Sequence, residues 1–212
     1  MIKSVQLPSK NCKICPRLYG FRKENKKKFS GWHNAPVTPF GSLSSQLLIV
    51  GLAPGLRGAN RTGRPFTGDY AGVLLFDTLL DYNFAIGGHE NHADDNFELL
   101  DCRITNGVRC VPPQNKPIGS EVNGCRPFLK NEIDAMPNLK CILVLGVIAH
   151  NTVLRALNQK ASLWKFQHNA LHKLPNLPLL INSYHCSRYN TNTGRLTEKM
   201  FNDVFQTIRK FI

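Results

Sequence analysis

Residues 47–55 read Leu-Leu-Ile-Val-Gly-Leu-Ala-Pro-Gly, a short apolar run that ends in a turn rich in glycine and proline. A run of this length, bounded by a turn, predicts a strand over Leu47–Gly51 that is buried on both faces, as strands of parallel sheets are. Three more runs of this kind follow along the chain. They are Cys102–Val108, Cys141–Gly146 and Leu179–Tyr184.

A helical pattern follows each of the four runs. These patterns cover roughly Ala71–Tyr82, Glu121–Met136, Val147–Gln159 and Thr197–Phe211. Alternation of strands and helices predicts an α/β fold, here a three-layer α/β/α sandwich around a central, mostly parallel four-stranded sheet. The 212 residues fit a single domain, 1–212, whose N-terminal part, 1–30, carries a Cys-x-x-Cys and a basic stretch at 21–30.

The composition is that of a basic globular protein. Hydrophobic residues make up 42%, an ordinary share for a folded domain. Lys and Arg outnumber Asp and Glu 27 to 14, which gives a net charge of +13. Such a surface is expected to attract polyanions, and nucleic acid first among them, although a basic protein without such a partner is the plain alternative.

The chain is expected to remain in the cytoplasm of an archaeal or bacterial cell. No segment approaches the ~20 apolar residues that cross a bilayer, and Met1–Lys10 lacks the apolar core of a signal peptide. Thiols are reduced in that compartment, so metal binding explains seven cysteines better than disulfides do. Cys102 and Cys141 lie within apolar runs and are interpreted as core residues, while the role of Cys186 stays open.

Four of the cysteines form a candidate metal site. Cys12 and Cys15 belong to one Cys-x-x-Cys, and Cys110 and Cys125 lie 15 positions apart. Four thiolates suit either tetrahedral zinc or a [4Fe–4S] cluster, and spacing alone does not choose between them. Pro16 after Cys15 slightly favours a cluster. Four unrelated thiols are the alternative.

The loop after the first predicted strand is the richest in chemistry. Ligands of open α/β sheets bind beyond the carboxyl ends of the strands. The loop matches neither a Walker A sequence nor a dinucleotide fingerprint. It places Arg57, Arg61 and Arg64 over a candidate anion path. Phe66 is a candidate platform for stacking a base, against the alternative of a loop anchor.

Gly51-Leu-Ala-Pro-Gly55, followed by Asn60-Arg-Thr-Gly-Arg-Pro-Phe-Thr-Gly-Asp69, resembles the first motif of the family 5 uracil-DNA glycosylases (UDGb), the iron–sulfur branch of their superfamily. Four other segments resemble that family in the same order along the chain, and together they span residues 12 to 197. They are Cys12–Leu18, Ile104–Pro117, Cys125–Leu129 and Ser183–Thr197.

The resemblance implies a DNA repair enzyme that hydrolyses the N-glycosidic bond of uracil and leaves an abasic site. Its partner would be double-stranded DNA containing deaminated bases, with hypoxanthine among the tolerated lesions. The target nucleotide must be flipped out of the stack, at a cost of a few kcal/mol. The resemblance also implies a structural [4Fe–4S] cluster, whose ligands would fall on Cys12, Cys15, Cys110 and Cys125.

The resemblance assigns residues to base recognition. Phe66 would stack on the flipped base, and Asn106 would offer a donor and an acceptor to the uracil edge. The pocket wall would be lined by the backbone amides of Gly51, Leu52 and Ala53. Arg188 and Tyr189 would fill the gap left by the flipped base or contact phosphates.

Catalysis would fall on His185 and Asp69. His185 would hydrogen-bond the base oxygen on which negative charge develops, with a capping or core histidine as the alternative. Asp69 would stabilise the sugar cation or orient the attacking water, with capping of the following helix as the alternative role. The neighbouring family 4 has an acidic residue where this chain has Leu52, so the resemblance moves the catalytic burden to Asp69.

Other functions stay open on the sequence. A non-catalytic iron–sulfur or zinc protein that binds nucleic acid is the main alternative, and the set of Asp69, Asn106 and His185 argues against it. An electron-transfer protein is disfavoured by the basic charge. A sliding clamp is a candidate partner, no membrane is expected, and the chain is expected to act as a monomer.

Overall fold

The computed structural model describes residues 5–212, which form a six-stranded sheet with the strand order β1-β5-β2-β6-β8-β7. Its four central strands are parallel: β2 (Leu47–Gly51), β5 (Cys102–Asn106), β6 (Cys141–Leu145) and β8 (Leu179–Ser183). Two short antiparallel strands, β1 (Phe40–Gly41) and β7 (Leu171–His172), close the edges.

The three-layer fold and the four predicted strands are confirmed, but the sheet has six strands and not four. Both added strands are two residues long, and a segment that short carries no periodic pattern to find. A separate two-stranded hairpin, β3 (Ala85–Ile86) and β4 (Glu98–Leu99), lies outside the main sheet.

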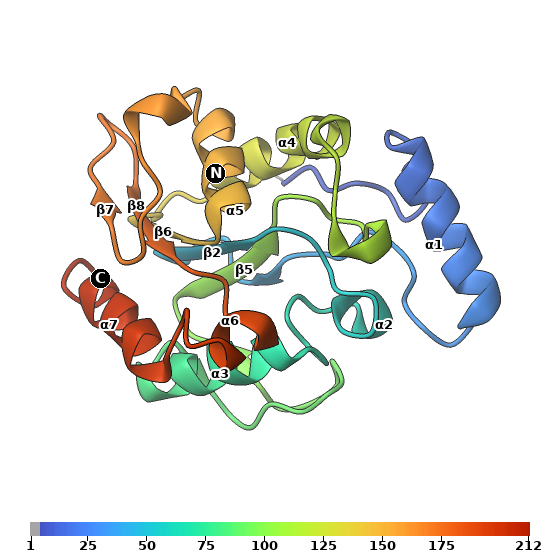
Figure 1. Ribbon diagram of the computed structural model, residues 1–212, viewed down its shortest axis with the longest axis horizontal. Helices are drawn as coiled ribbons and strands as arrows, with labels where there is room; N and C mark the ends of the chain where they lie inside the picture. The colour runs from blue at the N-terminus through green and yellow to red at the C-terminus, as the bar shows by residue number, and fades with distance from the viewer. Residues whose placement is uncertain (1–4) are drawn as a thin grey trace.

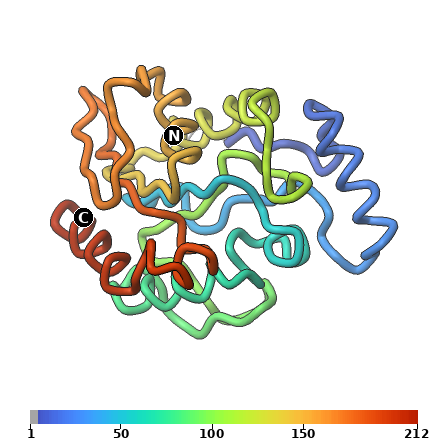
Figure 2. The backbone as a smooth tube through the Cα atoms, viewed as in Figure 1, coloured from blue at the N-terminus to red at the C-terminus, as the bar shows by residue number. Residues whose placement is uncertain are grey.

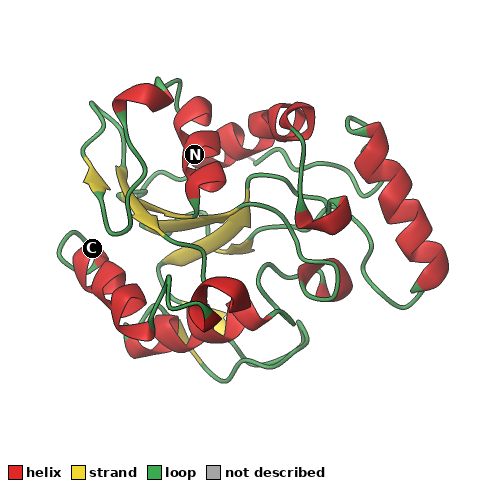
Figure 3. Ribbon diagram, viewed as in Figure 1, coloured by secondary structure: helices red, strands yellow, loops and turns green. Residues whose placement is uncertain are grey.

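Helices cover both faces of the sheet (Figures 1 and 3). One face carries α3 (Tyr70–Asp81) and α7 (Glu198–Ile208), and the other carries α4 (Gly119–Asp134) and α5 (Val147–Ala156). No helix within residues 5–212 combines the length and the apolar character needed to cross a bilayer.

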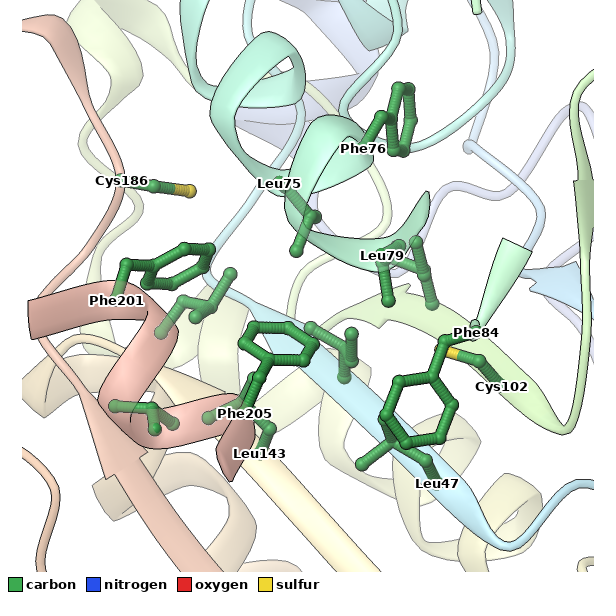
Figure 4. Close-up of a cluster of buried hydrophobic side chains, with 14 of the residues drawn as sticks. Leu47, Leu75, Phe76, Leu79, Phe84, Cys102, Leu143, Cys186, Phe201 and Phe205 are labelled. Carbon is green, nitrogen blue, oxygen red and sulfur yellow. The ribbon is translucent and has the colours of Figure 1, made fainter. Parts of the chain in front are cut away.

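The alternation of side chains along β2 builds the core on both sides. Leu47 and Ile49 face the α3 and α7 layer, where Phe205 packs with them (Figure 4). Leu48 and Val50 point the other way, into the cluster formed with α4 and α5. Successive side chains of this fully buried strand point to opposite faces of the sheet, so β2 packs against both helical layers.

Three of the remaining short elements follow the carboxyl ends of parallel strands. The chain leaves β2 toward α2 (Ala59–Thr62), β5 toward η1 (Pro113–Asn115) and β8 toward α6 (Arg188–Asn192), as Figure 1 shows. Beyond α2 lies α1 (Pro16–Lys28), outside the two helical layers. A further turn, η2 (Ala161–Leu163), follows α5.

Candidate active site

A cavity of about 490 Å³ opens beyond the carboxyl ends of β2, β5 and β8. Segments far apart in the sequence contribute its walls, as expected for this end of a parallel sheet. Predicted site residues that line it are Leu52, Ala53, Phe66, Asp69, Asn106, His185 and Arg188.

The floor of the cavity depends on the lack of a side chain at Gly51. A Cβ there would lie 2.5 Å from Oδ1 of Asn106 and 2.8 Å from Cζ of Phe66. Gly51 also pairs with Asn106 in the register of β2 and β5. Glycine is therefore what lets the aromatic ring and the amide meet over the end of the sheet.

Phe66 holds an unusual backbone conformation, with φ of +58°. An aromatic residue in the left-handed region carries strain, and such strain is commonly found at functional sites. Its ring is buried and lies nearly parallel to the imidazole of His185, with 6.1 Å between the ring centroids and 25° between the planes.

His185 follows β8 and has its backbone fixed by a neighbour. Its carbonyl oxygen accepts a hydrogen bond of 2.8 Å from Nδ2 of Asn190 in α6. Burial lowers the pKa of His185 to about 4. The imidazole is therefore neutral at pH 7, where it offers one N–H donor and one acceptor.

Asp69 occupies the N-cap position of α3, but its side chain makes no capping hydrogen bond. The carboxylate instead accepts a hydrogen bond from the backbone N–H of Ala59 and packs against Gly58, where a Cβ would overlap it. Burial raises the pKa of Asp69, and the Ala59 N–H and the charge of Arg61 partly offset this rise. The helix-capping alternative therefore finds no support in the geometry.

Three of the predicted DNA-binding cations lie at this end of the sheet. Arg57 and Arg188 are exposed, and the Arg188 guanidinium lies 5.0 Å from the centre of the Tyr70 ring. Arg61 is half-buried and donates hydrogen bonds to the carbonyl oxygens of Arg57 and Asn91, at 2.8 and 2.9 Å.

The prediction that Arg64 lies over the anion path is wrong. Its side chain is 7% exposed, and its guanidinium pairs with Asp95 at both carboxylate oxygens. Burial acts to raise the pKa of Asp95, but hydrogen bonds from Arg64 and from two backbone N–H groups outweigh it and lower that pKa to about 2. Arg64 thereby anchors the segment 85–97, which had no predicted structure and runs beside α3 along the lower border of Figure 2.

Three cavity-lining residues with polar side chains were not among the predicted site residues: Tyr70, Asn115 and Ser187. Tyr70 is exposed and directly follows Asp69, and its hydroxyl accepts a hydrogen bond from Thr191. Asn115 adopts φ of +56° in η1. Asn115 and Ser187 lie inside motifs quoted above and Tyr70 directly follows one, so position beside the motif residues was the only sequence signal for these three side chains.

The four predicted metal-ligand cysteines surround one small cavity between α1, α4 and the start of the chain. Burial raises the pKa of Cys110 to about 12, and the other three cysteines are close enough to add to that rise. Within residues 5–212, however, no three His, Cys, Asp or Glu side chains form a group that could hold a single metal ion.

Two arginines adjoin this cavity. Arg22 is 4% exposed, borders the cavity, and donates to the carbonyl oxygens of Lys10 and Cys12 at 2.8 and 2.6 Å. Its buried Nε has no hydrogen-bond partner. The backbone N–H of Arg109 donates to the sulfur of Cys125.

Cys186, whose role the sequence left open, is a core residue. It is fully buried among the side chains of the α3 and α7 face, and its thiol donates to the carbonyl oxygen of Ala71 at 3.3 Å (Figure 4). The thiol thereby ties the loop that carries His185 to the first turn of α3.

Known proteins resemble this chain over most of its length. Residues 38–209 match the Uracil DNA glycosylase superfamily. A type-5 uracil-DNA glycosylase of Thermus thermophilus is 38% identical over 204 residues, covering 94% of this chain and 93% of that protein. One from Pyrobaculum aerophilum is 35% identical over 200 residues, covering 92% and 87%.

A type-4 uracil-DNA glycosylase of Pyrobaculum aerophilum is 33% identical over 153 residues, covering 72% of this chain and 64% of that protein. The type-5 relatives thus match more of the chain than this type-4 relative does. This chain belongs to the uracil-DNA glycosylase superfamily and, within it, to the type-5 uracil-DNA glycosylases.

Proposed function

We propose that this protein excises uracil from double-stranded DNA by hydrolysing the N-glycosidic bond, and that it accepts other deaminated bases such as hypoxanthine. One observation carries the proposal. Phe66, Asn106 and His185, which come from three separate segments, line one cavity together with a half-buried carboxylate, Asp69. Membership of the type-5 uracil-DNA glycosylases supports the same activity.

The flipped base lies against the Phe66 ring, and the amide of Asn106 donates to and accepts from its Watson–Crick edge. As the bond between C1′ and N1 breaks, negative charge grows on the base. The neutral imidazole of His185 donates its N–H to the base oxygen and stabilises that charge.

Asp69 acts on the other side of the same bond. Its carboxylate stabilises the cationic sugar and accepts the proton of the water whose oxygen bonds to C1′. The departing base keeps the electron pair of the broken bond. The raised pKa of Asp69 makes its carboxylate a better proton acceptor than an exposed carboxylate.

We further propose that Cys12, Cys15, Cys110 and Cys125 hold a [4Fe–4S] cluster. The four thiols share one cavity, and the orphaned Nε of Arg22 at its border is a donor suited to an anionic centre. A bound cluster would supply a rigid tie between the N-terminal segment, the loop after β5 and α4.

The activity is tested with duplexes containing U·G, U·A or hypoxanthine·T pairs, followed by alkaline cleavage of abasic sites. We expect strand cleavage that depends on the protein and the lesion. If protein with an intact cluster leaves every duplex whole, the proposed activity is refuted.

The cluster is tested by the absorbance of anaerobically purified protein at about 400 nm. Cys110→Ser should lose this absorbance. Cys141→Ser is the matched control, because Cys141 is a buried cysteine of the central sheet outside the four-cysteine cavity. Retention of the absorbance by Cys110→Ser, or its loss from both variants, would show that the ligands are assigned wrongly.

A further inference from the structure

The basic stretch at 21–30 plays no part in the active site. Most of it lies in α1, where Lys23, Lys26, Lys27 and Lys28 leave Glu24 as the only carboxylate. The helix buries one apolar side chain, Leu18, together with the polar Arg22 and Asn25. Hydrophobic packing therefore does not explain why this helix is conspicuously cationic.

One side of α1 borders a groove of about 540 Å³. Its lining includes three exposed lysines, Lys10, Lys23 and Lys26, and contains no carboxylate. None of these lysines forms an ion pair with another residue of the described chain, 5–212. The groove thus concentrates positive charge without a partner inside the protein, which favours an anionic ligand.

Side chains of α1 fix the shape of the groove. The Arg22 guanidinium is buried and bonded to the carbonyl oxygens of Lys10 and Cys12. The Tyr19 ring lies in the lining, with the Lys23 ammonium 5.7 Å from its centre. Lys23 and Lys26 therefore belong to a helix that is held in place by the hydrogen bonds of the buried Arg22 side chain.

The far wall of the groove is joined to the active site. The backbone N–H groups of His33 and Asn34 donate to the carbonyl oxygens of Arg61 and Asn60, at 3.0 and 3.1 Å. Those two residues belong to α2, whose first residue, Ala59, lines the base cavity. The helix α2 therefore separates the groove from the cavity; Figure 1 shows this helix between α1 and α6.

The helix α2 sets the spacing between the two sites. An α-helix with its side chains is about 10–12 Å across, and the phosphates of one DNA strand advance about 3.4 Å per nucleotide along the axis. A strand whose uracil enters the cavity would therefore bring phosphates to the groove about three nucleotides away from the lesion.

We propose that this groove binds the phosphate backbone of the damaged duplex about three nucleotides from the flipped nucleotide, with Lys23 and Lys26 as the contacts. The inference rests on the proposed function, because the lesion in the cavity fixes the position of the strand. It assigns the basic stretch the task of holding one flank of the duplex while the base is drawn out.

Salt dependence tests the charge contribution of the groove. Binding to a duplex with an abasic-site analogue is measured over a range of salt concentrations. Replacement of both lysines in Lys23→Gln/Lys26→Gln should make the slope of log K against log [salt] shallower by about 2. The double variant Lys160→Gln/Lys165→Gln, two exposed lysines outside both hollows, is the matched control and should keep the wild-type slope.

Neutral phosphates test the position. A single methylphosphonate is moved stepwise along each flank of the lesion. It should weaken binding of the wild-type protein most at about three nucleotides on one side, and the lysine variant should lose that sensitivity. Thermal melting of each variant establishes that it is folded.

The outcomes separate this inference from the proposed function. If the wild-type protein releases uracil and the folded lysine variant keeps the wild-type salt slope, the proposed role of the groove is refuted and the proposed function stands. A shallower slope and a lost phosphate effect would support it. Failure of the wild-type protein to release any deaminated base would overturn the proposed function, whatever the slope.

Discussion

His185 is the residue on which the chemistry of the cavity depends most. Its imidazole is neutral because burial lowers its pKa to about 4, so it can donate an N–H to the departing base without a full positive charge. His185→Ala should lower single-turnover uracil release by roughly 10²–10³-fold, the usual cost of removing one such donor. Affinity for a duplex with an abasic-site analogue should change little.

His92→Ala is a suitable control, because His92 is a half-exposed histidine that does not line the cavity. It should release uracil at the wild-type rate. Equal loss of turnover and affinity in His185→Ala would contradict the assigned role, since it would indicate a collapsed cavity.

Asp69 should set the acid limb of the pH profile. The ionised carboxylate is the active form, and burial raises its pKa above the ordinary 3.8. As the pH is lowered, the rate of uracil release should therefore begin to fall at a higher pH than the pH at which an exposed carboxyl group titrates. Protonation of His185 should add to the fall near pH 4. Asp69→Asn should release uracil slowly and should lose the contribution of the Asp69 carboxyl to this limb, and an unchanged limb in the variant would exclude Asp69 as its source.

At the scale of residues, the sequence predicted the positions of those site residues that belong to its motifs. Asn106 ends one buried strand and His185 follows another. Parallel strands bring their carboxyl ends to one edge of the sheet, so the meeting of these two residues was predictable. Arg64 was misplaced because its partner, Asp95, lies 31 positions away in a segment without a pattern. The sequence does not show whether an arginine in a loop faces solvent or pairs with a buried carboxylate.

Elements with an apolar period were predicted well, and those without one were missed. The four central strands begin where predicted and end within two residues of the predicted ends. The helix α1 was not predicted, because Leu18 is the only apolar side chain that it buries. Its position depends on Arg22 and on the cysteines beside it, contacts that no period along the helix encodes.

The junction of α4 and β5 contains a buried cluster of charges that the sequence did not reveal. Glu132 of α4 is fully buried and accepts hydrogen bonds from Arg103 at 2.6 Å, from Thr105 at 2.9 Å and from Arg109. Glu132→Gln would leave two buried guanidinium groups without their counter-charge. The free energy of unfolding should fall by roughly 3–5 kcal/mol, measured by urea denaturation.

The same helix supplies the control for this prediction. Asp134 pairs with Lys130 one turn away, but both side chains are 47% exposed. Asp134→Asn should therefore cost at most about 0.5 kcal/mol. Similar losses in both variants would mean that Glu132 contributes no more than a surface charge does.

On the scale of the whole molecule, the net charge of +13 leaves exposed cations at two places that we propose contact DNA. Arg188 lines the cavity, Arg57 is exposed in the loop after β2, and Lys23 and Lys26 line the groove beyond α2. Four phosphate contacts at these positions would give a salt slope of about −3.6, or roughly a 10²-fold loss of affinity between about 50 and 200 mM salt.

Salt should act on the capture of DNA and leave the chemical step alone. The bond to uracil breaks among His185, Asp69 and Phe66, which are at least half-buried, and buried charges are screened much less than exposed ones. As salt rises, kcat/KM should therefore fall with the affinity, while single-turnover uracil release at saturating protein stays constant. A parallel fall of both rates would mean that the charges of the outer surface take part in breaking the bond, and that the cavity does not separate the two tasks.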